Sequence, residues 1–216
     1  YGGQTISLAH LAPYVRVSYE KYLREVAAEG QENDIQYTQS QIEKIAKRRT
    51  RKEVKDGVQT IQYQINTLAT SNGQSPFVSL FMYLEEAGEY EEEMAMIIEE
   101  VLSQRLKGIK NEKGVYVSPA FPKLLYVLDE NNIHKDSKYR HLTELAARCV
   151  SRRLMPDFIS AKVMKENVGH VFPPMGCRSF LSPWYDENGN AKFYGRFNMG
   201  VVSVNLPDIA LSADGD

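Results

Sequence analysis

The chain has 216 residues, enough for one large domain or two small ones. Its 26 Lys and Arg residues against 28 Asp and Glu residues give a net charge of −2, which argues against a dedicated nucleic-acid-binding or membrane-surface protein. A hydrophobic content of 43% is too high for a disordered chain, and no stretch approaches the roughly 18 apolar residues of a membrane span. Two cysteines cannot form a disulfide framework, so we expect a cytoplasmic protein.

The first 70 residues are predicted to be helical and charged. Residues 6–28 carry apolar side chains at helical spacing, which predicts a first helix. A second helix is expected to begin near Thr38 or Ser40 and to end near Thr70. At its start, Ser40 and Glu43 have the spacing of a capping box.

The remaining residues mix strands and helices. The expected strands are 77–84, 124–128, 176–181 and 200–206, and the expected helices are 89–107 and 138–154. The run Glu-Asn-Gly-Asn at 187–190 predicts a turn. Strands that alternate with long helices indicate an α/β fold, so we divide the chain into a helical region, 1–70, and an α/β region, 71–216. The chain begins without Met and ends in a polar run, from which we expect a piece of a longer protein.

Metal and nucleotide motifs are absent from the sequence. No CxxC pair is present and the four histidines are widely scattered, so we predict no metal site within the chain. Neither a P-loop nor a Rossmann fingerprint occurs.

A cationic run marks the second predicted helix. One interpretation is a solvated face paired with Glu43 and Glu53. The other is a site for a polyphosphate or an acidic partner, because so many cations on one helix repel one another. The central residues of this run are Lys47, Arg48, Arg49, Arg51 and Lys52.

The two cysteines lie in different surroundings. Cys149 falls in a helical stretch and is predicted to be a packed core thiol. Cys177 follows Pro173, Pro174 and Gly176, which together predict a constrained loop that presents the thiol. A structural thiol is the simplest interpretation of Cys177, and a reactive cysteine is the alternative.

Asn198 directly precedes the last predicted strand. A buried amide at this position must find hydrogen-bond partners. A bound ligand is one source of such partners, and ordinary turn capping is the other.

Four segments resemble the anaerobic (class III) ribonucleoside-triphosphate reductases. The similarity runs over nearly the whole chain in the family's order. Cys177 and Asn198 are 198 − 177 = 21 positions apart. This spacing is similar to the one expected in the subgroup of the family that uses formate. The segments are Gly-Gly-Gln-Thr-Ile at 2–6, Asn-Thr-Leu-Ala-Thr-Ser-Asn-Gly-Gln-Ser-Pro-Phe at 66–77, Met-Gly-Cys-Arg-Ser-Phe-Leu at 175–181 and Gly-Arg-Phe-Asn-Met-Gly at 195–200.

The resemblance implies a glycyl-radical enzyme built on a ten-stranded α/β barrel with a finger loop, here around 172–181. Cys177 matches the cysteine that becomes a thiyl radical and abstracts the 3′ hydrogen of the substrate ribose. Asn198 matches a residue that hydrogen-bonds in the substrate and formate pocket, and Met175 lines that pocket. The matching substrate-binding segment contains Asn72, Gln74 and Ser75.

The same resemblance implies several partners and cofactors. The glycine that stores the radical, a four-cysteine zinc site, the second catalytic cysteine and any ATP-cone are expected outside this chain. An iron–sulfur enzyme that uses S-adenosylmethionine is expected to generate the radical. A homodimer is expected to form through the helices of 1–70, with the cationic run contacting a dNTP or ATP effector. No nucleic acid is expected to bind directly.

Two alternatives remain at this stage. One is a glycyl-radical enzyme of the pyruvate formate-lyase type. Such an enzyme commonly carries a neighbouring cysteine at the loop tip, whereas Gly176 and Arg178 flank Cys177 here. The other is that this piece by itself is a non-catalytic, nucleotide-binding dimerisation module.

Overall fold

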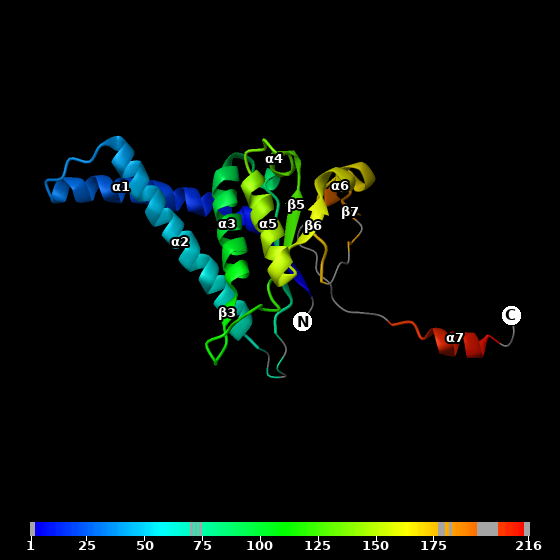
Figure 1. Ribbon diagram of the computed structural model, residues 1–216. Helices are drawn as coiled ribbons and strands as arrows, with labels where there is room; N and C mark the ends of the chain where they lie inside the picture. The colour runs from blue at the N-terminus through cyan, green and yellow to red at the C-terminus, as the bar shows by residue number, and fades with distance from the viewer. Residues whose placement is uncertain are drawn as a thin grey trace.

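A parallel sheet forms the centre of the chain in the computed structural model, which describes residues 3–69, 71, 73, 75–176, 180–181, 183–193 and 203–213. Its strand order is β1–β2–β5–β6, and every neighbouring pair is parallel. Figure 1 labels β5 and β6 of this sheet. The strands are β1 (Gln4–Ser7), β2 (Val78–Met82), β5 (Lys123–Leu128) and β6 (Asp157–Ser160). The predicted α/β class is therefore confirmed, whereas the ten-stranded barrel stays a prediction.

Helices make the connections between these strands. Both α1 and α2 connect β1 to β2, while α3 connects β2 to β5 and α5 connects β5 to β6. In Figure 1, α1 and α2 extend beyond the sheet and meet at their connecting loop. None of the helices in the described residues is long and apolar enough to cross a membrane. The helices are α1 (Ala12–Glu32), α2 (Gln39–Thr67), α3 (Glu91–Lys107), α4 (Glu130–Ile133), α5 (Arg140–Arg153), α6 (Ala161–Val168) and α7 (Leu206–Ser212).

The two faces of the sheet are buried differently. Alternate residues of a strand point to opposite faces. Leu80 and Tyr126 belong to the larger core cluster, which α1, α2, α3 and α5 complete. Phe81 and Val127 belong to a smaller cluster that includes Ile159 and is flanked by Met164 of α6. Since both faces are covered, β2 directs apolar side chains to each of them, as the sequence at 77–84 predicted.

The start of α2 shows why the helix begins where it does. The Thr38 hydroxyl accepts a hydrogen bond from the Gln41 backbone N–H at 3.3 Å, and the Gln41 side chain accepts one from the Thr38 N–H at 2.8 Å. This reciprocal pair is the capping box of α2. The predicted box of Ser40 and Glu43 was wrong, because both residues already lie inside the helix.

Other boundaries also differ from the prediction. The stretch predicted as a helix from residue 6 begins as strand β1, because Ile6 pairs with Leu80 across the sheet. The prediction of a strand at 200–206 was wrong for its last residues, 205 and 206. There the Asn205 side chain accepts a hydrogen bond from the Asp208 N–H and starts α7. Residues 177–179 of the strand predicted at 176–181 lie outside the described residues.

Two short antiparallel pairs complete the fold. The turn predicted at 187–190 is confirmed, since it joins β7 (Trp184–Tyr185) to β8 (Ala191–Lys192). The other pair is β3 (Ile109–Lys110) with β4 (Tyr116–Val117), directly after α3.

Replacing Thr38 with Ala is expected to loosen the first turn of α2, since loss of an N-cap side chain typically costs about 1 kcal/mol. Hydrogen exchange of the peptide that spans 38–44 in the full-length protein should show protection lowered by about fivefold. Ser40→Ala is the matched control and should leave exchange unchanged. Equal effects of the two variants would contradict the Thr38 assignment.

Candidate functional site

Two of the six predicted catalytic and substrate-binding residues lie within the described part of the chain. Met175 is buried, with 8% of its surface exposed, and Ser75 is exposed. Gly176, directly before Cys177, is also described. The other predicted residues lie outside the described residues, namely Asn72, Gln74, Cys177 and Asn198.

The segment that leads to Cys177 packs against the amino end of β1. The Thr5 hydroxyl donates a hydrogen bond to the Pro174 carbonyl at 2.8 Å. A Cβ added to Gly3 would lie 2.8 Å from the Gly176 Cα, a separation that backbone atoms do not allow. Gly176 itself has a φ of +65°, which favours glycine. Two glycines therefore allow the chain just before Cys177 to lie directly on β1.

The predicted substrate segment reaches the same end of the sheet. It ends at Phe77, whose carbonyl accepts a hydrogen bond from the Gln4 N–H at 2.9 Å. The Phe77 ring lies 3.4 Å from the Cβ position of Gly3. The chain at Ser75–Phe77 and the chain at Met175–Gly176 thus flank one residue, Gly3. We call this region, at the amino ends of β1 and β2, the amino-end site.

Sequence reasoning missed two contributors to the amino-end site. Gly3 entered the sequence analysis only through the resemblance of 2–6, although a glycine that precedes a strand can signal a close backbone approach. Lys123 begins β5, and its Nζ lies 5.5 Å from the centre of the Phe77 ring. Lys123 therefore places a positive charge beside the predicted substrate segment.

Most of the predicted effector-binding cations are paired within the chain. Arg49 makes two hydrogen bonds of 2.7 Å to the Glu29 carboxylate of α1, and this pairing holds the pKa of Glu29 below its usual range. Arg51 contacts Glu99 of α3 at 3.1 Å. Lys52 pairs with Asp56 one helical turn further along α2 at 2.5 Å.

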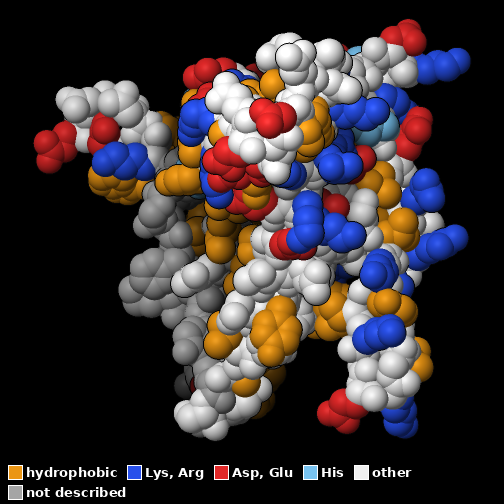
Figure 2. All heavy atoms as spheres, turned by 90° about the vertical axis from the view of Figure 1, so that its left-hand side faces the viewer, with side chains coloured by type: hydrophobic (Ala, Val, Ile, Leu, Met, Phe, Trp, Pro, Cys, Tyr) orange, Lys and Arg blue, Asp and Glu red, His pale blue; other side chains and the backbone are white. Residues whose placement is uncertain are grey.

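The pairing differs from the solvated-face interpretation of the sequence. Glu43 and Glu53 were expected to pair with the cationic run, but Gln39 donates a hydrogen bond to Glu43, and Ser18 and Tyr22 donate to Glu53. Over the middle of the face in Figure 2, Lys and Arg side chains lie among Asp and Glu side chains. The run therefore helps to join α2 to α1 and α3, and it does not form one continuous basic patch.

Two of the predicted effector residues line a cavity. Lys47 and Arg51 contribute to a hollow of about 370 Å³ between α1, α2 and α3 that the turn before α5 closes. Lys138 adds positive charge to its wall, His141 adds an imidazole ring, and three glutamates of α3 add negative charge. Arg48 is exposed on α2 and is not part of this lining.

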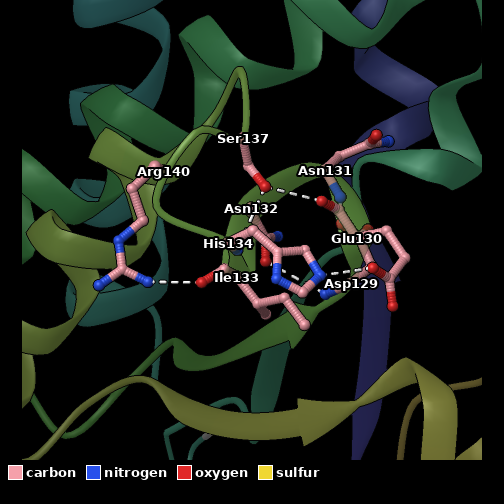
Figure 3. A network of polar contacts seen from close by, with 8 residues as sticks. All are labelled: Asp129, Glu130, Asn131, Asn132, Ile133, His134, Ser137 and Arg140. Carbon is pink, nitrogen blue, oxygen red and sulfur yellow. Dashed lines mark hydrogen bonds and ion pairs between the residues drawn. The ribbon is translucent and has the colours of Figure 1, made fainter.

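A polar network occupies the opposite, carboxyl end of β5 (Figure 3). The Asp129 carboxylate caps α4 by accepting a hydrogen bond from the Asn131 N–H at 2.9 Å. Arg140 donates to the Ile133 carbonyl at 2.6 Å, and Ser137 donates to the Glu130 carbonyl at 2.8 Å. These bonds fix the short connection between β5 and α5.

The Asp129 carboxylate is the group in this network whose hydrogen bonding is incomplete. Asp129 is 8% exposed, and its Oδ2 atom has no hydrogen-bond partner. Burial raises the pKa of its carboxyl group to about 6, and the nearby carboxylates of Glu85 and Glu91 act in the same direction. Neighbouring Tyr83 donates a hydrogen bond to Glu85, which also pairs with Lys165 at 2.6 Å. No three side chains among the described residues come together as a metal site.

The parallel sheet, its helical crossovers and the loop packed on its amino end define part of an α/β domain. The family model of anaerobic ribonucleoside-triphosphate reductase matches residues 1–216. Proteins with this description are 38% identical over 218 residues in Enterobacteria phage T4 and 40% identical over 221 residues in Escherichia coli strain K12. A third, from Salmonella typhimurium, is also 40% identical over 221 residues.

The chain belongs to the anaerobic ribonucleoside-triphosphate reductase family. The alignments cover 99% of this chain against the phage protein and 100% against the Escherichia coli protein. They cover 34% and 29% of those relatives, so the chain spans about a third of their length. The resemblance drawn from the sequence segments is thereby confirmed at the level of the family.

Replacing Asp129 with Asn is expected to change how local stability depends on pH. The folded-state pKa of about 6 lies above the ordinary 3.8, so the folded protein holds this proton more tightly than the unfolded chain. Stability from this group is therefore lost as pH rises from about 4 to 6, and the loss persists above pH 6.

The asparagine side chain of this variant does not ionise and still offers an oxygen to cap α4. The ratio of hydrogen-exchange protection at 126–140, variant over parent, should rise roughly tenfold between pH 4 and pH 7. A ratio that stays flat over this interval would contradict the raised pKa.

Proposed function

We propose that the full-length protein reduces ribonucleoside triphosphates to deoxyribonucleoside triphosphates, with Cys177 as the thiol that reacts with the ribose. One observation carries the proposal, in addition to family membership. The chain before Cys177 is packed on β1 at the same end of the sheet where the predicted substrate segment terminates. A reactive thiol needs such a rigid approach, because it must meet one carbon of the substrate.

In the proposed reaction, Cys177 gives its hydrogen atom to the radical stored outside this chain, and the resulting thiyl radical abstracts the 3′ hydrogen of the ribose. The 2′ hydroxyl then leaves as water. Formate supplies two electrons and the hydrogen that C2′ gains, and it is oxidised to carbon dioxide. The hydrogen atom held on Cys177 then returns to C3′. Asn198 can hold a hydroxyl or formate by hydrogen bonds without adding charge. Met175, which is buried, supplies an apolar wall that excludes water.

The radical is proposed to be stored on a glycine outside this chain and generated by a partner iron–sulfur enzyme that uses S-adenosylmethionine. The four-cysteine zinc site belongs to the same outside region. Within this chain, Asn72, Gln74 and Ser75 are the proposed contacts to the substrate. Family membership argues against the pyruvate formate-lyase type of enzyme.

The α1–α2 pair is proposed as the dimer interface and effector-binding region. Tyr14 and Val17 of α1 are exposed to solvent, at 70% and 59%, and so is Leu11 directly before this helix, at 36%. Beside them lies a largely apolar cavity of about 420 Å³ between α1 and α2. Exposed apolar surface of this kind is typical of a protein–protein contact. Lys47, Arg48, Arg49, Arg51 and Lys52 are the proposed phosphate contacts of the effector.

Cys177→Ser in the full-length enzyme should leave the radical signal intact and abolish turnover. After anaerobic activation, electron paramagnetic resonance should report a glycyl radical equal to that of the parent. Formate-dependent reduction of a ribonucleoside triphosphate should fall by at least about a thousandfold, because a group that reacts directly has no substitute.

Cys149→Ala is the matched control for this test. The Cys149 thiol is fully buried in α5, and burial raises its pKa, as suits the predicted core thiol. Its removal should leave turnover within about threefold of the parent, because a thiol packed in the core takes no part in the reaction. Retained turnover in Cys177→Ser would overturn the proposed function.

Arg48→Ala is expected to weaken the effect of a dNTP effector on substrate choice. The readout is the ratio of two substrates reduced in competition, as the effector concentration is raised. The half-maximal effector concentration should rise about five- to tenfold, which is the usual size of one allosteric contact.

Arg49→Ala needs a separate control, because Arg49 also joins α2 to α1. Glu29→Gln weakens that ion pair and leaves the cation in place. Equal changes in Arg49→Ala and Glu29→Gln would assign Arg49 to helix packing. An unchanged response in Arg48→Ala would remove that residue from the effector site.

A further inference from the structure

A buried arginine holds the loop that precedes β5. Arg105, in the last turn of α3, is 1% exposed. Its guanidinium donates to the Pro119 carbonyl at 2.6 Å and to the Pro122 carbonyl. Burial lowers the pKa of Arg105 to about 10, so the group remains charged at neutral pH. Its described hydrogen bonds go to main-chain carbonyls, which makes the guanidinium a clamp on residues 119–122.

The clamped loop is also held from α2. The Asn66 side chain donates one hydrogen bond to the Gln62 carbonyl within the last turns of α2 and another to the Phe121 carbonyl at 3.0 Å. The Phe121 ring in turn packs on Phe77, with ring centres 4.8 Å apart. Helices α2 and α3 therefore both hold the backbone that carries the Phe121 ring.

Phe77 passes this constraint to the amino-end site. Its carbonyl is bonded to the Gln4 N–H, and its ring lies against Gly3. Gly3 approaches Gly176 so closely that even a methyl group would displace the backbone. The series of contacts from Arg105 therefore ends one residue before Cys177 and passes two residues after Ser75.

We propose that Arg105 and Phe121 are positioning residues for ribonucleotide reduction. They act through Phe77, whose place sets the approach to Cys177 and the end of the substrate segment. This inference rests on the proposed function, and it adds two residues that the sequence motifs did not include.

A displacement of Phe77 should lower the rate of ribonucleotide reduction more than it lowers the amount of stored glycyl radical. The glycine that stores the radical lies outside this chain in the proposed function, whereas the contacts of Phe77 lead to the chain beside Cys177. Geometry errors near 1 Å at a reacting group cost on the order of a hundredfold in rate. A purely structural role would instead lower stability and leave the kinetic constants of the folded enzyme unchanged.

The test compares Phe121→Leu and Phe121→Tyr in the full-length enzyme. Phe121 is only half-buried, so the leucine variant is expected to fold. Leucine removes the ring from Phe77, and tyrosine keeps it. With equal radical content by electron paramagnetic resonance, Phe121→Leu should lower kcat/KM by about 10- to 100-fold. Phe121→Tyr should stay within about threefold of the parent, because the ring contact is retained.

Arg105→Lys tests the first residue in the series of contacts that leads to Phe77, and it is compared with a matched control. Lysine keeps the charge but has no planar fork to bridge two carbonyls. Arg153→Lys is the control. Arg153 donates to the Leu106 and Lys107 carbonyls at the end of α3 and to the Ser118 hydroxyl, without a hydrogen bond to the carbonyls of 119–122. Only Arg105→Lys should reproduce the loss of kcat/KM in Phe121→Leu.

The outcomes separate this inference from the proposed function. Parent-like kcat/KM in Phe121→Leu, alongside an inactive Cys177→Ser, would overturn the positioning role and leave the proposed function standing. A Phe121→Leu defect that disappears when activity is normalised to folded, radical-bearing protein would also overturn it. An active Cys177→Ser would overturn the proposed function, on which this inference rests.

Discussion

The pairing of β1 with β2 is the constraint on which the rest of the structure depends. Gln4 stands opposite Val78, so the first strand finds its partner only after α1 and α2 have been completed. A parallel pair requires such a crossover connection. Because of this pairing, α1 and α2 pack on one face of the sheet, and Gly3 lies beside Phe77.

The same pairing explains how distant parts of the sequence meet. Gly3, Phe77 and Gly176 belong to three segments separated by long stretches of chain, yet they touch at one point. Two of these three residues are glycines, because a side chain at Gly3 would strike backbone atoms and Gly176 has a positive φ. The resemblance of residues 2–6 and 175–181 to one family therefore has a structural counterpart in this contact.

The fold was predictable where local patterns agree with tertiary packing. The strand expected at 77–84 forms over 78–82, and the helix expected at 89–107 forms over 91–107. Both were predictable because an apolar run covered on both faces favours a strand, and an amphipathic run with an acidic start and a basic end favours a helix. The strand β1 was missed, since four residues carry no periodic signal and only pairing with β2 reveals them. The capping box was placed two residues late, because Ser40 and Glu43 satisfy the same spacing as Thr38 and Gln41.

The candidate site was predictable in part. The family motifs pointed to Met175 and Ser75, and the structure brings their segments to one end of the sheet. No motif pointed to Arg105, which the helical pattern of α3 places among ordinary basic residues near a helix end. Only its burial and its bonds to two carbonyls distinguish it from Lys107, which ends the same helix.

Several arginines of this chain join one structural element to another. Arg49 and Arg51 connect α2 to both of its neighbours, and Arg105 connects α3 to the loop beneath α2. An effector on α2 would compete with Glu29 and Glu99 for these cations, so its binding would alter how α2 sits on α1 and α3. Asn66, near the end of α2, bonds to the Phe121 carbonyl. A shift of α2 would therefore reach Phe77 through Asn66 and the Phe121 ring. These contacts would give the proposed effector a physical route to the proposed substrate segment.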